Sequence, residues 1–545
     1  MTSPADHDQR LAEVRRATAA GDLATAAVLA ESALRDGLNH PMLVGVLVTR
    51  REQEGRFEEA LALLRQLKAA MAPNVPVLRS MGLALLRLDR LDEAVAEFTE
   101  ALAIDPRCAD VLAHRAMAQT GLGKISTARR GFEQALTIDP ANVVALNGLA
   151  GLALRRGETG LARQLANSAL NHHPNLPGPL LTVAGACIAD GKVVEAEEVA
   201  RKLADDPAVP PKDRVVAFGL LGEALDAQRR FDEAFAAWGE ANGLLREAYR
   251  STFEAGPGAL SLVQSLTAVL RDRTFASPSA DASTGPAREH VFLLGFPRSG
   301  TTLLEQALEE HADIVTMPER DCLVEGSRDW LADAGRLEGL LAADGAELEP
   351  YRASYWQRVL SQGLDPAARV FVDKNPFNSL RLPLITRLFP DARIILAERD
   401  PRDVVLSCFR HRFQMSPATW QLLSLEGAAT LYNATMELVA ASEAAFGLDL
   451  CRTALEDVVA DFDAETKRIC AFIGVEWSPL LRDFGTHSAN RDIATPSGPQ
   501  LVRGLNARGI GKWRDYQRQL APVLPMLQPW VDRFERRVDK RCAPS

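Results

Sequence analysis

Residues 289–308 read EHVFLLGFPRSGTTLLEQAL, and this short segment holds three kinds of sequence in a fixed order. The apolar run that ends at Gly295 is typical of a buried parallel strand, and the residues after Thr302 favour a helix. A glycine-bounded loop between such a strand and helix directs backbone amides and the helix N-terminus toward an anion. We therefore expect a phosphate-binding loop made by Pro297, Arg298, Ser299, Gly300, Thr301 and Thr302.

The glycine spacing of this loop is that of a Walker A loop, but the residues around the second glycine differ. A nucleotide triphosphatase uses a Lys-Ser or Lys-Thr pair there, with the lysine on the β- and γ-phosphates. Here Thr301 and Thr302 hold those positions, and the cationic residue, Arg298, lies inside the loop. A P-loop kinase or NTPase is therefore the less favoured alternative.

The Pro-Arg-Ser-Gly-Thr-Thr sequence in this setting resembles the sulfotransferase family, and the resemblance extends from about residue 290 to 515. Within the family it is most similar to the tyrosylprotein sulfotransferases. The resemblance implies 3'-phosphoadenosine 5'-phosphosulfate (PAPS) as the sulfonate donor. A second predicted strand, 392–397, leads into Arg399 and, eight residues later, Ser407. The family has an arginine and a serine at this offset that bind the 3'-phosphate of the donor, a group suited to a guanidinium and a hydroxyl.

Further residues match the family at its own spacings. Glu319 lies 21 residues after Arg298, where the family has its catalytic glutamate. Lys374 stands 25 residues before the arginine of the second block, again as in the family. Ser497 precedes Lys512 by 15 residues, and the family has a serine and a donor-binding lysine at that separation.

The reaction that this resemblance implies is sulfonate transfer from PAPS to a hydroxyl, by an in-line displacement governed by positioning and electrostatics. Glu319 would take the acceptor proton as general base. Arg298, Lys374 and Ser497 would stabilise charge on the sulfonyl oxygens and the leaving phosphate. Because lysine and arginine can do this alone, we expect no metal ion. The seven cysteines are scattered without a Cys-x-x-Cys pair, so we assign no metal site.

Three positions depart from the family pattern. Leu455 stands where the family often has tyrosine, and His411 follows Ser407 by four residues, where arginine is common. The tyrosylprotein sulfotransferases carry arginines after the catalytic glutamate, whereas acids, including Asp321 and Glu325, occur in that stretch here. The donor site therefore follows the family more closely than the acceptor site does.

A repeat of 34 residues runs through the first half of the chain, and small residues, a glycine and a proline each keep its phase. Small residues let two antiparallel helices approach closely, a glycine breaks the chain between them, and a proline stops the second helix. The pattern resembles the tetratricopeptide repeat (TPR), with about six or seven units, the last displaced by four residues. The positions in phase include Ala94, Ala128, Ala162; Gly21, Gly55, Gly123, Gly157, Gly191; and Pro106, Pro140, Pro174.

The expected fold is an all-α TPR solenoid followed by an α/β P-loop-like sulfotransferase domain with a parallel sheet, similar to the bacterial TPR-sulfotransferases. We expect the repeat array at 5–250, a connecting helix and linker at 251–288, and the sulfotransferase domain at 289–540. Stacked repeats leave a concave surface that commonly binds peptides or proteins. An acceptor protein, peptide or glycan held there is one use of the array. A spacer or dimerisation arm, and hence a homodimer, is the other.

Composition limits the remaining classes. The net charge of -10 and pI of about 5.6 argue against a nucleic-acid partner, which usually needs a basic face. Residues 1–11 lack the apolar core of a signal peptide, and no apolar run approaches the ~18 residues that indicate a membrane span. We therefore expect a cytoplasmic protein. A TPR scaffold with an inactive transferase domain stays an alternative, although the matched catalytic residues argue against it.

Overall fold

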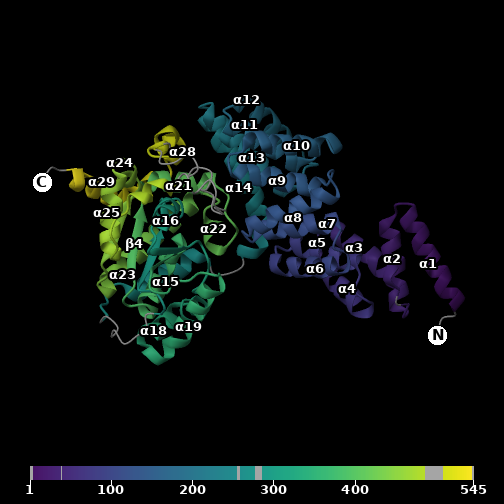
Figure 1. Ribbon diagram of the computed structural model, residues 1–545, viewed down its shortest axis with the longest axis horizontal. Helices are drawn as coiled ribbons and strands as arrows, with labels where there is room; N and C mark the ends of the chain where they lie inside the picture. Colours follow the sequence, from purple (N-terminus) through teal and green to yellow (C-terminus); the bar gives the residue numbers. More distant parts are fainter. Residues whose placement is uncertain are drawn as a thin grey trace. The chain divides into compact units, whose positions relative to one another are not determined.

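The computed structural model describes residues 4–38, 40–254, 258–275, 285–484, 507 and 509–542. Two compact units divide the chain, Met1–Ala186 and Cys187–Ser545. The first consists of helices, and the second holds further helices and a parallel sheet (Figure 1). An all-α repeat array followed by an α/β domain with a parallel sheet, as predicted from the sequence, is thereby confirmed.

Antiparallel helix pairs build the first unit, and the repeat residues lie where consecutive helices meet. The in-phase alanines are fully buried. The in-phase glycines stand between the helices of a pair with φ of 72° to 77°, a conformation that glycine adopts readily. The helices are α1 (Pro4–Ala19), α2 (Leu23–Arg35), α3 (Pro41–Gln53), α4 (Phe57–Ala70), α5 (Val75–Arg87), α6 (Leu91–Ile104), α7 (Ala109–Gly121), α8 (Ile125–Ile138), α9 (Val143–Arg155), α10 (Thr159–His172) and α11 (Pro177–Ala189).

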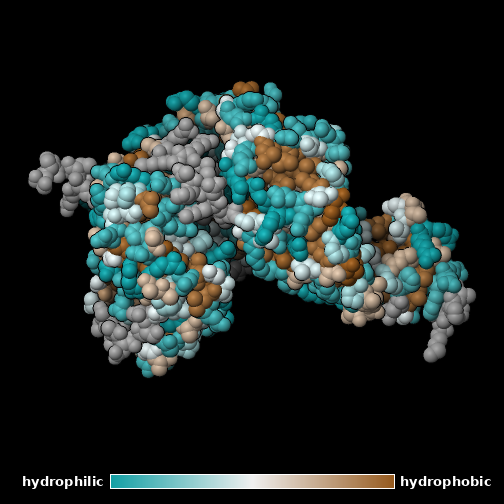
Figure 2. Space-filling view, viewed as in Figure 1, coloured by the Kyte–Doolittle hydropathy of each residue, from teal (hydrophilic) through white to brown (hydrophobic). Residues whose placement is uncertain are grey.

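The recurring aromatic residue of the repeat packs against a glycine of a neighbouring helix. A Cβ at Gly82 would lie 2.4 Å from the Phe98 ring, and one at Gly148 would lie 2.3 Å from the Phe132 ring. The glycines therefore make the space that the rings fill, as close helix packing requires. Figure 2 shows that apolar side chains also reach the surface of this unit, over the helices labelled α9 and α10 in Figure 1.

The second unit opens with helices and then forms the sheet. Its first helices are α12 (Val193–Asp205), α13 (Pro211–Ala227), α14 (Phe231–Phe253) and α15 (Ala259–Leu270). The strands are β1 (Glu289–Gly295), β2 (Ile314–Met317), β3 (Val370–Lys374), β4 (Arg393–Glu398) and β5 (Leu450–Ala454). Their order in the sheet is β2-β3-β1-β4-β5, and every pair of neighbours is parallel.

Helices cover both faces of the sheet, so its strands are buried on both sides, as parallel sheets usually are. The helices and short 3-10 turns after β1 are α16 (Thr301–Glu309), α17 (Val324–Trp330), α18 (Ala334–Ala342), α19 (Gly345–Ser361), η1 (Pro376–Arg381), α20 (Leu382–Leu388), α21 (Pro401–Arg410), α22 (Pro417–Gln421), α23 (Leu425–Phe446), α24 (Leu455–Ala460), α25 (Phe462–Ile473), η2 (Pro479–Asp483), η3 (Lys512–Tyr516), α28 (Gln517–Leu520) and α29 (Leu524–Cys542).

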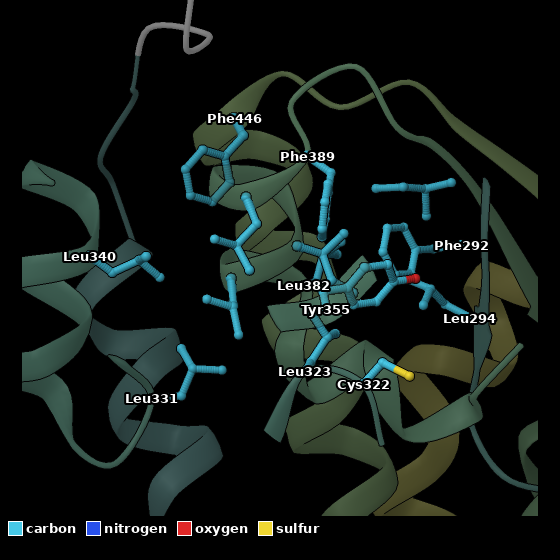
Figure 3. Packing of buried hydrophobic residues seen from close by; sticks show 14 of the residues in the cluster. Phe292, Leu294, Cys322, Leu323, Leu331, Leu340, Tyr355, Leu382, Phe389 and Phe446 are labelled. Atoms are coloured by element: carbon cyan, nitrogen blue, oxygen red, sulfur yellow. The ribbon is translucent and has the colours of Figure 1, made fainter. Parts of the chain in front are cut away.

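Alternate residues of β1 belong to two different cores, one on each face of the sheet. Val291 and Leu293 pack in one cluster, and Phe292 and Leu294 in the other. Figure 3 shows the second cluster, where Phe292 and Tyr355 lie among aliphatic side chains from several helices. The two cores hold β1 rigidly at the centre of the sheet.

The topology decides where ligands can bind. Because β1 is central, the chain leaves it toward β2 on one side and later returns to β4 and β5 on the other. In open parallel sheets, ligands bind beyond the carboxyl ends of the strands at such a switch point. The loops that follow β1, β2 and β4 lie at this edge with the end of β3. These segments, together with α16 and α21, carry most of the residues singled out from the sequence.

The helical hairpin α13–α14 packs on the sheet-bearing part of the second unit. The Nδ2 of buried Asn242 donates to the carbonyl of Phe409 on α21 at 3.0 Å, and the rings of Phe235 and Phe409 stack at 4.7 Å. The limits expected from the sequence, 5–250, 251–288 and 289–540, stay a prediction. The structure adds that helices before residue 250 pack against the helix that carries Ser407.

Candidate active site

The loop between β1 and α16 makes a tight turn beside the neighbouring strand. A Cβ at Gly295 would lie 2.7 Å from the carbonyl oxygen of Ala397 on β4, so only glycine fits there. Ser379 fastens the start of the loop, since its Oγ donates to the Gly295 carbonyl at 2.6 Å and accepts from the Gly295 amide at 3.1 Å. Gly300 caps α16 with φ of 96°. Leu455 lies against Gly300, at the position where the family resemblance led us to look for a tyrosine.

Arg298 lies in the left-handed region, with φ of 73°, and its side chain contacts α21. Its Nε donates to Ser407 Oγ at 3.1 Å, and its Nη2 lies 3.3 Å from His411 Nε2. His411 Nδ1 lies 2.8 Å from the carbonyl of Ser407, which can only accept, so Nδ1 carries the proton and Nε2 accepts from the guanidinium. Burial, together with nearby arginines, holds the pKa of His411 well below its usual value, so this ring is neutral.

A second arginine, Arg399, lies close to Arg298 in the structure. Arg399 is 7% exposed, its Nη1 donates to the carbonyl of Arg298 at 3.1 Å, and its Nη2 donates to the carbonyl of Gly509. Its Nε is buried and meets no hydrogen-bond partner among the described residues. Burial lowers the pKa of Arg298 to about 10, and the charges of Arg399 and Arg410 act in the same direction. We call Arg298, Arg399 and Ser407 the arginine cluster.

A different group of charges lies at the end of β3. Lys374 is fully buried, and its Nζ lies 2.8 Å from Glu319 Oε1 and 3.1 Å from Glu305 Oε2. The side chain of Glu305 is 3% exposed, whereas that of Glu319 is 41% exposed. Burial alone would lower the pKa of Lys374, but the two carboxylates outweigh it and raise that pKa. Burial raises the pKa of Glu305 to about 7, although Lys374 opposes the shift. We call these three residues the lysine cluster.

The two clusters are neighbours at the sheet edge. Glu305 lies on α16, the helix that begins immediately after the loop that carries Arg298. β1 and β3 pair with Leu293 opposite Lys374, so the lysine stands beside the start of that loop. The charge of Glu319 also acts on Arg298. The sequence-predicted residues of the loop, β3 and α21 are therefore brought together.

Lys512 is placed differently. Its Nζ lies 3.0 Å from Asp226 Oδ1 and 2.9 Å from Asp515 Oδ2, and it also lies over the rings of Phe231 and Tyr516. The turn that carries Lys512 is fastened near Arg399, because Asp403 accepts from the amides of Gly511 and Trp513 at 2.6 and 2.7 Å. The role of Lys512 in donor binding stays a prediction.

The remaining predicted residues of the loop before α16 are buried or hydrogen-bonded. Ser299, Thr301 and Thr302 are buried at the start of α16. The carbonyl of Pro297 accepts from Cys408 Sγ at 3.4 Å. Ser497, the predicted catalytic serine, lies outside the described residues.

The acidic residues after Glu319 are already paired. Arg381 donates to both carboxylate oxygens of Asp321, at 2.7 and 2.8 Å, and Glu325 pairs with Arg358. Both pairs are partly exposed, and each acid is matched by an arginine.

Sequence reasoning missed Glu305, His411 as a partner of Arg298, and Asp403. The sequence around Glu305 reads as an ordinary helix, and a helical glutamate is usually exposed. One signal was available, because Glu305 follows Thr301 by four residues and so lies on the face of the helix that continues from the loop.

Comparison with known proteins agrees with this class of fold. Residues 290–479 match the model of the sulfotransferase family, and residues 80–108 match that of the tetratricopeptide repeat. The chain thus combines a segment that matches the tetratricopeptide repeat with a region that matches the sulfotransferase family.

The regions that match known relatives span different shares of this chain. An uncharacterized protein of Aquifex aeolicus (strain VF5) is 24% identical over 351 residues, which span 63% of this chain and 45% of that protein. Protein-tyrosine sulfotransferase 2 of Gallus gallus is 25% identical over 255 residues, 44% of this chain and 67% of the relative. The matched region thus spans about half the length of the first relative and about two thirds of the second.

Solved structures were matched as well. The sulfotransferase domain of the Synechococcus PCC 7002 olefin synthase has 21% identity and a TM-score of 0.31, covering 44% of this chain and 91% of that domain. A tetratricopeptide repeat protein from Parabacteroides merdae has 19% identity and a TM-score of 0.36, covering 44% of this chain and 93% of the other.

Among the residues that the structure describes, no helix is both long and apolar enough to cross a membrane. Nor do the described ranges place three or more His, Cys, Asp or Glu side chains where they could hold a metal ion.

Proposed function

We propose that this protein transfers a sulfonate group from PAPS to a hydroxyl of a protein, peptide or glycan. The observation that carries the proposal is the position of the two clusters at one edge of the sheet. PAPS has a phosphosulfate at one end and a 3'-phosphate at the other, so it needs two anion-binding regions. The loop before α16 supplies one, and Arg399 with Ser407 supplies the other.

The arginine cluster supports the 3'-phosphate assignment on physical grounds. The guanidinium of Arg399 donates to the backbone carbonyl of Arg298, its charge acts on Arg298, and its buried Nε has no hydrogen-bond partner among the described residues. Leaving such a donor unsatisfied costs ~1–3 kcal/mol, more for a charged group. An incoming phosphate oxygen would satisfy it and offset the repulsion between the two cations.

The lysine cluster supports the chemical step. Glu319 is the more exposed of its two carboxylates and would take the proton from the acceptor hydroxyl. The acceptor oxygen then bonds to sulfur while the bond from sulfur to the 5'-phosphate oxygen breaks, leaving 3'-phosphoadenosine 5'-phosphate (PAP). Lys374, Arg298 and Ser497 would stabilise the charge that grows on the sulfonyl group and on the leaving phosphate. No step requires a metal ion.

The acceptor is proposed at the level of class. Relatives from several animals are named protein-tyrosine sulfotransferases, which favours a tyrosine hydroxyl in a peptide or protein. The helical repeats favour a macromolecule, because a stacked array offers an extended binding surface beside the catalytic domain in the chain. A cytoplasmic location and a homodimer are compatible with this proposal.

The proposal is tested by incubating the full-length protein with ³⁵S-labelled PAPS and fractionated lysate, followed by mass spectrometry of labelled products. We expect a labelled macromolecule and stoichiometric release of PAP. Turnover of ATP without use of PAPS would replace the proposal with a kinase or NTPase. Tight binding of PAPS with no labelled product in any fraction would instead favour a scaffold with an inactive transferase domain.

A further inference from the structure

A buried carboxylate that the reaction does not obviously need lies beside the catalytic lysine. Glu305 Oε2 is 3.1 Å from Lys374 Nζ, and both side chains are buried. Glu319 already pairs with the same ammonium at 2.8 Å. A buried acid is costly unless it is paired and hydrogen-bonded. A second carboxylate on one lysine therefore calls for a reason of its own.

The position of Glu305 on α16 links the phosphate loop to the end of β3. Glu305 lies one helical turn after Thr301, so both residues are on the same face of α16. The helix thus presents its N-terminus to the loop and, one turn later, a carboxylate to Lys374. Because Gly300 and Ser379 fix the loop, the Glu305 carboxylate is held at a fixed distance from the anion site.

We propose that Glu305 is a positioning residue, which holds the ammonium of Lys374 between α16 and Glu319 and so aims it at the reacting group. An ammonium has three N–H donors. In the part of the chain that the structure describes, Glu305 and Glu319 take two of them. With two donors fixed at 3.1 and 2.8 Å, the direction of the third is fixed as well. This inference rests on the proposed function and names a residue on which that function depends.

Glu305 also sets the charge of the cluster. One lysine with two ionised carboxylates carries an excess negative charge, which disfavours a nearby anionic donor. Burial raises the pKa of Glu305 to about 7, so this carboxyl can take up a proton when an anion binds, without releasing Lys374 from the hydrogen bond.

A first experiment tests the pairing itself and needs neither donor nor acceptor. The chain has nine lysines, so their ε-carbons can be labelled with ¹³C and followed by NMR during a pH titration, with Lys374→Arg assigning the signal. We expect the titration midpoint of Lys374 in the wild type to lie above the usual value of a lysine, because the two carboxylates raise its pKa, and to fall by about one unit or more in Glu305→Gln. Glu310→Gln, which removes the same charge at the C-cap of α16, serves as the control and should leave it unchanged. An unchanged midpoint in Glu305→Gln would overturn the proposal.

A second experiment tests the consequence for catalysis in the full-length enzyme. In Glu305→Gln we expect kcat for PAPS conversion to fall on the order of 10- to 100-fold, the usual scale for a misplaced reacting group. Affinity for PAP should stay equal or become tighter, because a negative charge near the anion site is removed. An unchanged kcat, or a parallel loss of kcat and PAP affinity in a folded variant, would contradict a positioning role. If the wild type binds no PAP, the proposed function fails, while the lysine titration still decides whether Glu305 holds Lys374.

Discussion

The arginine cluster and the lysine cluster lie at the same edge of the sheet, yet their charges are balanced in opposite ways. Arg399 donates to the backbone carbonyl of Arg298, a neutral His411 lies beside the Arg298 guanidinium, and the Asp403 carboxylate lies 3.9 Å from Arg399. Lys374 instead sits between two carboxylates. The first cluster has excess positive charge and the second excess negative charge.

This difference separates binding from chemistry. A cluster with excess positive charge is stabilised by an anion, as a donor phosphate would supply. A cluster with excess negative charge is stabilised by a proton, which is what a general base must accept from a hydroxyl. Under the proposed function, an anion-accepting site and a proton-accepting site therefore lie side by side at one edge of the sheet, and Arg298 would serve both.

The largest effect is expected from neutralising Glu319 in the lysine cluster. Glu319→Gln keeps the shape of the side chain but removes the base, so turnover of PAPS should fall by ~10²–10⁴-fold. PAP affinity, measured by calorimetry, should stay near that of the wild type, because the arginine cluster is unchanged. Wild-type turnover in this variant would rule out the assigned role.

Removing a charge from the arginine cluster should have the next largest effect, and on binding rather than on chemistry. Arg399→Gln should weaken PAP binding by ~1.5–3 kcal/mol, about 10- to 150-fold, the scale of one hydrogen bond to a charged group. Adenosine 5'-phosphosulfate, which lacks the 3'-phosphate, should bind the variant and the wild type alike. The control is Arg393→Gln at the other end of β4, where Arg393 pairs with Glu289. Equal losses for both ligands would mean that Arg399 does not contact the 3'-phosphate.

The pH dependence of the free energy of unfolding tests whether Glu305, in the lysine cluster, holds a proton in the folded protein. The folded pKa of Glu305, about 7, is above its unfolded value of 4.5, so the folded state keeps a proton that the unfolded state has lost. The stabilisation from this group is complete below about pH 4.5 and is lost as pH rises to about 7. The free energy of unfolding of the wild type should therefore fall, relative to Glu305→Gln, on the order of 1–3 kcal/mol across that range. Denaturant titrations at several pH values measure it, and a constant difference between the two proteins would contradict the shifted pKa.

The smallest effect is expected from removing the first compact unit. A fragment that begins at residue 190 keeps α13 and α14, which pack on α21, so PAP affinity should match that of the full chain. If the repeats hold the acceptor, its KM should rise while kcat changes little, because uniform binding is what is lost. An unchanged acceptor KM in the folded fragment would favour the spacer or dimerisation arm.

The sequence predicted the elements of this site better than their contacts. The strand, loop and helix around Gly300 and the in-phase repeat glycines could be predicted because they depend on local backbone conformation and spacing. The hydrogen bond from Arg298 to Ser407 joins residues that are 109 positions apart in the sequence. It can form because β4 pairs with β1, which brings the segments after these two strands together. Pairing order is a property of the whole sheet, and no local pattern encodes it.

The burial of charged side chains was the second property that could not be predicted from the sequence. Glu305 and Lys374 are charged residue types, which are almost never fully buried unless they are paired. Only the three-dimensional structure shows that each buries the other. The partner of Lys512 was equally hidden from the sequence, because Asp226 belongs to α13, far away in the chain and before the sheet begins.

The most direct test of the account is a calorimetric comparison of PAP and adenosine 5'-phosphosulfate on the wild-type protein. The account predicts that PAP binds more tightly by about 10-fold or more, because its 3'-phosphate satisfies the buried Nε of Arg399 and the hydroxyl of Ser407. This preference should disappear in Arg399→Gln. Equal affinity of the wild type for the two nucleotides would contradict the assignment of the arginine cluster, and with it the proposal that PAPS is the donor.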